Sequence, residues 1–183
     1  MRTVILLAIL ISTTGVAQVV PNFSLTNVSN GQYVVLDNFS SLTGVVIIFS
    51  STDCPYDNYY LKRIHQLAET YKSQFAVLLI NSNSDESMDQ MKSYLENQNI
   101  TLPYLWDLEQ KVMKGLAAHK SPECFLLSTA GGKFTVVYKG SIDDNPQTES
   151  SVNKSYLKDA IEKLRSKQKI ETREVRPVGC SIR

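Results

Sequence analysis

The chain has 183 residues, of which 43% are hydrophobic and 20% charged, so it is long enough for one globular domain with a buried core. Its 19 lysine and arginine residues are balanced by 18 aspartate and glutamate residues, and this balance excludes the basic surface that holds a nucleic acid. The three cysteines, Cys54, Cys124 and Cys180, are too few for a disulfide-stabilised mini-domain, and their spacing matches no zinc-finger pattern. We therefore expect a single domain without a nucleic-acid partner, a metal site or a cofactor.

The first 17 residues have the pattern of an export signal. Arg2 supplies a positive start, residues 4–11 are an unbroken apolar run, and small residues follow up to Ala17. An uncleaved membrane anchor is the alternative, but the apolar run is far shorter than the roughly 20 residues that cross a bilayer. The favoured interpretation is a cleaved signal peptide over residues 1–17. It predicts an exported protein, periplasmic or extracellular, with no stable membrane insertion.

The first half of the remaining chain predicts a β-α-β unit preceded by a hairpin. Alternation, β-branched runs and an Asn30-Gly31 turn signal indicate strands, and apolar positions at helical spacing indicate a helix. The elements expected are a hairpin over 23–25 and 33–36, a strand over 45–49, a helix over 57–73 and a strand over 75–80. The two later strands are apolar throughout, which is typical of strands buried on both faces.

The second half predicts two helices, a hairpin and a closing helix. These elements are a helix from residue 84, a short helix over 108–116, a hairpin over 125–127 and 134–138, and a helix over 157–164. A polar tail follows over residues 167–183 and is expected to be flexible. The fold class is therefore α/β, with a central mixed sheet flanked by helices over residues 18–166 and an N-terminal β-hairpin.

Cys54 stands directly after the predicted central strand and before Pro55, where the helical pattern begins. Proline is favoured in the first helical turn, so the sulfur is expected at a helix N-terminus, where unpaired N–H groups stabilise a thiolate. Asp53 and Asp57 flank the sulfur and would oppose this effect by charge repulsion. The alternative is a small buried side chain that ends the strand. We favour the reactive cysteine.

Three segments carry a resemblance to a known family: residues 49–55 around Cys54, residues 121–126 around Pro122, and residues 138–144. In their order and spacing they resemble the thioredoxin-fold redoxins, which include peroxiredoxins of the alkyl hydroperoxide reductase/thiol-specific antioxidant type and exported thioredoxin-like oxidoreductases. Residues 177–182 are similar to the ending of some peroxiredoxin-like members. The resemblance implies a thioredoxin-like fold, Cys54 as the nucleophile, and a cis-proline at Pro122 beside an open backbone edge on which an extended peptide can pair.

The chain also departs from the family pattern. Asp57 stands where a Cys-x-x-Cys site has its second cysteine, so a local two-cysteine shuttle is impossible. Typical peroxiredoxins have a threonine three residues before the cysteine and a proline further upstream. In this chain Thr52 is only two residues before Cys54, and no proline lies between Pro21 and Cys54. The residues expected to shape the site are Thr52, Asp53, Pro55, Asp57, Ser121 and Pro122.

Oxidised Cys54 then needs another thiol to resolve it. Cys180 lies in the polar tail, which can search space at little strain, and the entropy of loop closure grows only slowly with length. Cys124 begins a predicted core strand and can help only if the fold already places it close to Cys54. An external thiol is the third possibility. We expect a Cys54–Cys180 link, within one chain or between two, ahead of a Cys54–Cys124 link.

Two chemistries fit an exported thiol-dependent oxidoreductase of this type. One is reduction of a peroxide through a sulfenic acid, and the other is exchange with a protein disulfide through a mixed disulfide. Both require an external thiol reductant. The opposing hypothesis is a non-enzymatic thioredoxin-like module that uses the same groove to bind an extended peptide or partner protein. The sequence predicts no oligomeric state.

Overall fold

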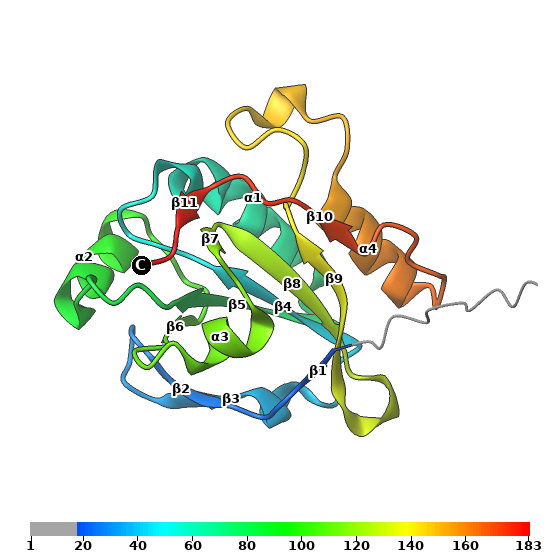
Figure 1. Cartoon of the computed structure of the whole chain (residues 1–183), viewed down its shortest axis with the longest axis horizontal. Coiled ribbons are helices and arrows are strands. Elements are labelled where there is room, and N and C mark those ends of the chain that lie inside the picture. Colours follow the sequence, from blue (N-terminus) through cyan, green and yellow to red (C-terminus); the bar gives the residue numbers. More distant parts are fainter. Residues whose placement is uncertain (1–17) are drawn as a thin grey trace, which may run out of the picture.

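A computed structural model describes residues 18–183, so the signal peptide expected over residues 1–17 lies outside the described residues. Nine strands form one mixed sheet in the order β1-β9-β8-β4-β5-β6-β2-β3, and β10 also pairs with β9 (Figure 1). The pairs β4–β5, β5–β6 and β9–β10 are parallel, and the other pairs of this sheet are antiparallel. Two further strands, β7 and β11, form a small antiparallel pair of their own.

The strands are β1 Val19–Val20, β2 Ser24–Asn27, β3 Tyr33–Val35, β4 Gly44–Phe49, β5 Phe75–Asn81, β6 Tyr104–Trp106, β7 Lys120–Ser121, β8 Glu123–Ser128, β9 Phe134–Gly140, β10 Glu174–Val175 and β11 Cys180–Ser181. The α-helices are α1 Pro55–Tyr71, α2 Met88–Asn97, α3 Lys111–Leu116 and α4 Tyr156–Arg165, and three short 3₁₀ turns cover Leu36–Phe39, Ala130–Gly132 and Glu149–Ser151.

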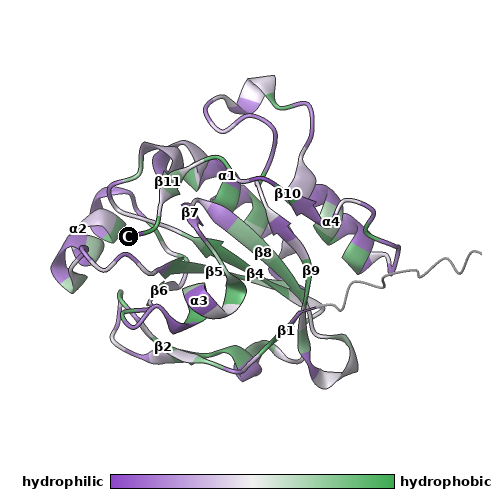
Figure 2. Ribbon diagram, viewed as in Figure 1, coloured by the Kyte–Doolittle hydropathy of each residue, from purple (hydrophilic) through white to green (hydrophobic). Residues whose placement is uncertain are grey.

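The central strand β4 is buried on both faces, as its apolar run predicts. Val46 and Ile48 contribute to a core cluster that also contains the apolar faces of α1, α2 and α4. Val45, Ile47 and Phe49 point to the opposite cluster, which α3 covers. Side chains of a strand alternate between its faces, so a strand between two helical layers must be apolar throughout. In Figure 2 the central strands are mainly hydrophobic and the surface loops mainly hydrophilic.

This arrangement confirms the predicted α/β class, the mixed sheet flanked by helices and the N-terminal hairpin, formed by β2 and β3. The helix expected from residue 84 begins later, at Met88, because Ser87 and Gln90 form a reciprocal capping box that starts it there. The short helix α3 also begins later than expected, at Lys111. Among residues 18–183, no helix is long and apolar enough to cross a bilayer.

The tail differs from the flexible segment that its polar composition predicts. Val175 of β10 pairs with Gly140 of β9, and Cys180 of β11 pairs with Ser121 of β7. Ile170 is buried in the core, and Ile182 packs against the cluster on the α3 side. In Figure 1 the tail runs from α4 past the end of β9 and over α1 to the region of β7. Exposed main-chain groups on β9 and β7 give the polar tail hydrogen-bond partners that its composition alone does not reveal.

Candidate functional site

Cys54 occupies the turn from the central sheet into the first helix. It is the N-cap residue of α1, and Pro55 follows in the first helical turn. The main-chain N–H of Asp57 donates to the carbonyl of Cys54 over 3.1 Å. The sulfur therefore lies at the positive end of a 17-residue helix, where a thiolate is stabilised. The side chain is nonetheless only 1% exposed.

A disulfide joins Cys54 to Cys180. The two sulfurs are 2.04 Å apart and the Cα atoms 5.9 Å apart, across 126 residues of sequence. The Cα separation lies in the usual range for a disulfide. The structure therefore contains, within one chain, the link that the sequence favoured over a Cys54–Cys124 pair.

Strand pairing places Cys180 beside Cys54. Cys180 pairs with Ser121 and Ser181 pairs with Lys120, and the main-chain N–H of Ile182 donates to the carbonyl of His119 over 3.1 Å. The Ser121–Pro122 peptide bond is cis, as the resemblance implied. The backbone edge beside this proline was expected to be open to a partner, but in this structure the protein's own tail covers it. The edge accepts an extended strand, and that strand is β11.

Ser121 contacts both Cys54 and Asp57. Its carbonyl oxygen is 3.1 Å from the sulfur of Cys54, a close contact rather than a hydrogen bond because a disulfide carries no S–H. Its hydroxyl donates to the Asp57 carboxyl over 2.6 Å. Ser121 therefore connects the disulfide to a buried acid.

Asp57 is 1% exposed, although it lies in the first turn of a helix. Burial raises its pKa from 3.8 to about 8, against the opposing effect of hydrogen bonds from Ser121, Ser50 and Ser51. The carboxyl is therefore mostly protonated at pH 7. While it is protonated, the Asp57 carboxyl exerts no charge repulsion on Cys54, and Asp53 lies exposed at the surface.

The loop before Cys54 is held by a carboxylate that the sequence did not single out. Glu86 is 3% exposed. It accepts hydrogen bonds from the hydroxyl of Ser51 at 2.5 Å, the main-chain N–H of Thr52 at 2.8 Å and the side chain of Asn81 at 2.7 Å. In sequence it lies just before the helix α2, and nothing there marks it as buried. These bonds make Glu86 the positioning residue for the loop that leads into Cys54.

A second buried carboxylate holds the strand on which the tail pairs. Glu123 is 6% exposed and follows the cis-proline directly. It accepts hydrogen bonds from the main-chain N–H groups of His119 at 2.8 Å and Lys120 at 3.0 Å. A glutamate at the start of an apolar strand is the only signal in the sequence that marks this position. Glu123 therefore positions His119 and Lys120, the residues that bond to Ile182 and pair with Ser181.

The end of the tail is held beyond the disulfide. Arg183 donates its main-chain N–H to the side chain of Asn83 at 3.0 Å, and its carbonyl accepts from Ser84 at 2.8 Å and from the side chain of Gln110 at 2.9 Å. Its guanidinium lies 3.2 Å from Asp85. Tail contacts on both sides of Cys180 therefore position its sulfur against Cys54.

Cys124 lies outside this arrangement. It is fully buried in β8, and its thiol donates to the carbonyl of Gly140 over 3.1 Å. Burial raises its pKa well above the ordinary value, which disfavours a thiolate. Cys124, the alternative candidate for the resolving cysteine, forms no disulfide in this structure.

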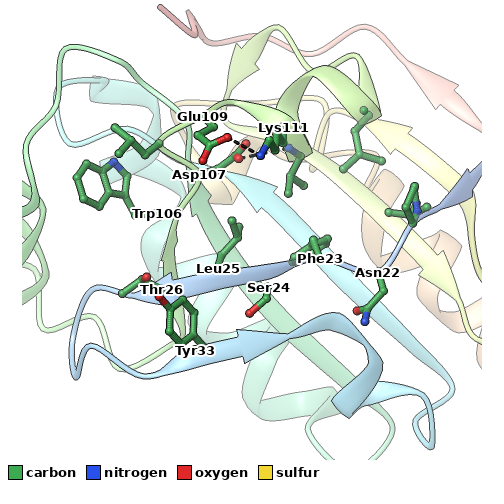
Figure 3. A pocket seen from close by; sticks show the side chains of 16 residues that line it. Asn22, Phe23, Ser24, Leu25, Thr26, Tyr33, Trp106, Asp107, Glu109 and Lys111 are labelled. Carbon is green, nitrogen blue, oxygen red and sulfur yellow. Dashed lines mark hydrogen bonds and ion pairs between the residues drawn. The ribbon is translucent and has the colours of Figure 1, made fainter.

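The other features of the described chain do not converge on Cys54. In residues 18–183, no group of three or more His, Cys, Asp or Glu side chains is arranged to hold a metal ion. A cavity of about 490 Å³ lies between β2 and α3, and none of its lining residues belongs to the cysteine site. Figure 3 shows Leu25 of β2 and Phe23, which directly precedes β2, pointing into it, and Lys111 paired with Glu109 among its lining residues.

Comparisons with known proteins agree with this geometry. Residues 16–144 match the model of the AhpC/TSA family. No curated protein matches the chain at the level of sequence. Among solved structures, a hypothetical protein from Sinorhizobium meliloti is 24% identical, with 93% of this chain and 95% of that chain covered and a TM-score of 0.80. An uncharacterised conserved protein from Geobacillus kaustophilus is 28% identical, with 91% and 90% covered and a TM-score of 0.81.

A third solved structure is more distant and shows the fold alone. It is a Chlorobium tepidum protein provisionally described as a thiol:disulfide interchange protein, DsbE, which is 16% identical, with 81% of this chain and 96% of that chain covered and a TM-score of 0.65. The similarity supports the thioredoxin-like fold that the sequence predicts.

Proposed function

Because the chain belongs to the AhpC/TSA family, we propose that it is an exported thiol-dependent oxidoreductase in which Cys54 is the nucleophile and Cys180 the resolving cysteine. The observation that carries the proposal is the disulfide between a helix N-cap cysteine and a cysteine of a paired strand. Cys180 lies beyond the matched residues 16–144, so this pairing is a feature of the chain's own tail. The sulfurs themselves carry the electrons, and the proposed cycle needs no cofactor.

The chemistry that the site supports best is exchange with a protein disulfide. The Cys54 thiolate attacks one sulfur of the substrate disulfide, forms a mixed disulfide and releases the other substrate sulfur as a thiolate. The Cys180 thiolate then attacks the Cys54 sulfur, closes the internal disulfide and releases the second substrate thiolate. The substrate gains two electrons and the protein loses two. An external thiol reductant restores the Cys54 and Cys180 thiols.

The pairing of β11 with β7 favours protein disulfides over peroxides. The pairing indicates that the edge of β7 accepts an extended polypeptide beside the Cys54 sulfur. Reduction of a peroxide would end in the same internal disulfide. There, Cys54 takes one peroxide oxygen to become a sulfenic acid and releases an alcohol or water, and Cys180 then displaces water. The two reactions are distinguished by their substrates and by the first product.

Export is proposed from the leader-like residues 1–17, which lie outside the described residues. The mass of the protein recovered after expression with its leader tests this proposal. Loss of residues 1–17 is expected, and retention of Met1 in the recovered protein would contradict it.

The experiment that tests the function compares two substrates. The reduced protein is mixed with insulin, as a protein disulfide, and separately with hydrogen peroxide, with dithiothreitol as the thiol donor. We expect faster reduction of insulin than in dithiothreitol alone, and loss of that acceleration in Cys54→Ser. The matched control is Cys124→Ser, which replaces a thiol that is absent from the disulfide.

Four outcomes decide between the hypotheses. Acceleration with peroxide alone would reassign the protein as a peroxidase. No acceleration with either substrate would contradict the enzymatic proposal. If Cys54→Ser kept the full activity, the nucleophile would be wrongly assigned. If the wild-type protein bound a partner protein without reducing it, and Cys54→Ser bound that partner equally well, the binding-module hypothesis would replace the enzyme.

A further inference from the structure

The tail occupies the site in the manner of a bound polypeptide, and this inference rests on the proposed disulfide exchange. Cys180 pairs with Ser121, Ser181 pairs with Lys120, and Ile182 donates to His119. The position of each tail residue is thereby defined relative to the Cys54 sulfur. A partner segment that pairs with the same edge and bonds to Cys54 has to present its residues at the same positions.

The position directly before the cysteine has no room for a side chain. A Cβ atom on Gly179 would lie 2.2 Å from the carbonyl oxygen of Ser121, 2.7 Å from its carbonyl carbon and 3.0 Å from the nitrogen of Pro122. All three atoms are main chain, and Ser121 is held both by Asp57 and by the pairing with β11. They cannot move as a flexible side chain can. Any residue except glycine at this position would displace the paired strand from Cys54.

The positions after the cysteine differ from one another. Ser181 is exposed. Ile182, the next residue, packs against the core cluster on the α3 side of the sheet. The edge therefore favours an apolar side chain two residues after the cysteine and discriminates little at the residue between them.

We propose that the β7 edge selects disulfide substrates whose reactive segment has the pattern Gly-Cys-x-apolar, in the register that the tail displays. The tail leaves the edge when its disulfide is reduced, and the segment of another protein pairs in its place. The Cys54 thiolate attacks the segment's cysteine, forms the mixed disulfide and expels the sulfur that was bonded to it. The returning tail displaces the segment when Cys180 attacks Cys54. Residues of the same chain have a high effective concentration, so the tail is an efficient displacing strand.

The test uses the full-length Cys180→Ser protein, reduced, with synthetic heptapeptides of the sequence of residues 177–183. The peptide cysteine is linked to 5-thio-2-nitrobenzoate, whose release upon attack by Cys54 is followed by absorbance. The peptides carry the native sequence or one of three changes at the positions of Gly179, Ser181 and Ile182: glycine to alanine, serine to alanine, or isoleucine to aspartate. Each rate is divided by the rate of the same peptide with N-acetylcysteine, which removes differences in intrinsic reactivity.

We expect the glycine-to-alanine peptide to react about tenfold or more slowly, because overpacking against fixed atoms costs more than about 1.4 kcal/mol. The isoleucine-to-aspartate peptide should be slower as well, and the serine-to-alanine peptide should match the native one. Equal rates for the glycine and alanine peptides would overturn the register. Equal peptide rates together with reduction of insulin by the wild-type protein would overturn only the register, whereas failure to reduce insulin would overturn the exchange function itself, so the two failures are distinguishable.

A second measurement uses the chain itself. Gly179→Ala should slow closure of the Cys54–Cys180 disulfide after addition of oxidised glutathione, measured by alkylation and mass spectrometry. Val178→Ala is the matched control, because Val178 is the neighbouring residue and is 49% exposed. Closure at the same rate in Gly179→Ala and Val178→Ala would contradict the steric argument even if the peptide rates differed.

Discussion

Cys54 and Cys124 are buried to almost the same extent, yet only one of them is bonded to the tail. Their side chains are 1% and 0% exposed, and each sulfur lies 3.1 Å from a main-chain carbonyl, that of Ser121 and that of Gly140 respectively. The tail pairs with both of these carbonyl residues, placing Cys180 beside Ser121 and Val175 beside Gly140. Burial and the nearest polar contact are therefore the same at both cysteines.

The difference lies in the surroundings that can change. Cys54 begins a helix, and the cover over it is a strand of the tail. Cys124 lies inside β8, between β4 and β9 and under the helices of the larger core cluster. Exposing Cys54 requires loss of one short strand, whereas exposing Cys124 requires opening the sheet. Burial by a removable segment is compatible with reactivity, but burial by the core is not.

The largest effect expected concerns turnover. Cys54→Ser should lower the rate of protein-disulfide reduction by at least about a thousandfold, because serine is a far poorer nucleophile at neutral pH. Cys124→Ser should change this rate less than about threefold, since the serine hydroxyl can keep the hydrogen bond to the carbonyl of Gly140. Steady-state reduction of insulin by the two variants, with circular dichroism to confirm the fold, measures this contrast. A large loss of turnover in a folded Cys124→Ser variant would contradict the division between the two cysteines.

The alkylation of the reduced protein should separate the same cysteines. Cys54 and Cys180 should react with iodoacetamide at least about a hundredfold faster than Cys124, whose burial raises its pKa and blocks access. Time-resolved peptide mass spectrometry in native buffer measures the three rates. The control is the same reaction in 6 M guanidinium, on the order of the concentration that unfolds even hyperstable domains, where the three thiols should become similar. Labelling of Cys124 as fast as Cys54 in the native protein would mean that the core opens as readily as the tail.

The disulfide should stabilise the fold through the long loop that it closes. Linking residues 126 positions apart restricts the unfolded chain, and disulfides typically contribute about 2–4 kcal/mol to the free energy of unfolding. We expect Cys180→Ser to lose about this amount relative to the oxidised protein in urea titrations. The reduced wild-type protein should behave like Cys180→Ser, and an unchanged unfolding midpoint upon reduction would show that the covalent link adds nothing to the tail's other contacts.

The smallest effect expected is a pH dependence that originates beside Cys54. Burial raises the pKa of Asp57 from 3.8 to about 8, so between these values the folded state keeps a proton that the unfolded state has lost. Stability from this group is fully present below about pH 4 and is lost as the pH rises toward 8. Oxidised wild-type protein should lose on the order of 1–3 kcal/mol more than Asp57→Asn between pH 5 and pH 8. Urea titrations at the two pH values measure this difference, and parallel losses in both proteins would contradict the assignment.

Local patterns were sufficient for most of the fold. The apolar run of β4 predicted a strand covered on both faces, and the helical spacing after Pro55 predicted α1 to within two residues of its start and end. An apolar face has to be buried, but any neighbouring apolar layer can bury it, so the pattern predicts the element without the identity of its neighbour. The same local reasoning identified the N-terminal position of Cys54 and, with the resemblance, the cis-proline at Pro122.

The site required contacts that local patterns do not contain. Glu86 and Glu123 resemble surface carboxylates in sequence, yet both are buried. Glu86 accepts from one main-chain N–H and two side chains, and Glu123 accepts from two main-chain N–H groups. Asp57 looked like a charged neighbour of Cys54, but burial changes its protonation. For Asp57, the balance between burial and hydrogen-bond donors that lie close in space, rather than in sequence, sets the pKa of the carboxyl.

By itself the sequence determined the α/β layers, the place of Cys54 at the start of a helix, and the absence of a second cysteine in its first turn. Only the tertiary structure decided that the polar tail pairs with β7 and that Gly179 lies against Ser121. The reason is that secondary structure follows from the periodicity of neighbouring residues. The cover over Cys54 instead depends on main-chain groups of β7, which lie some 60 residues before the tail residues that pair with them. A polar segment can pair with such groups or remain unpaired, and its composition does not distinguish the two cases.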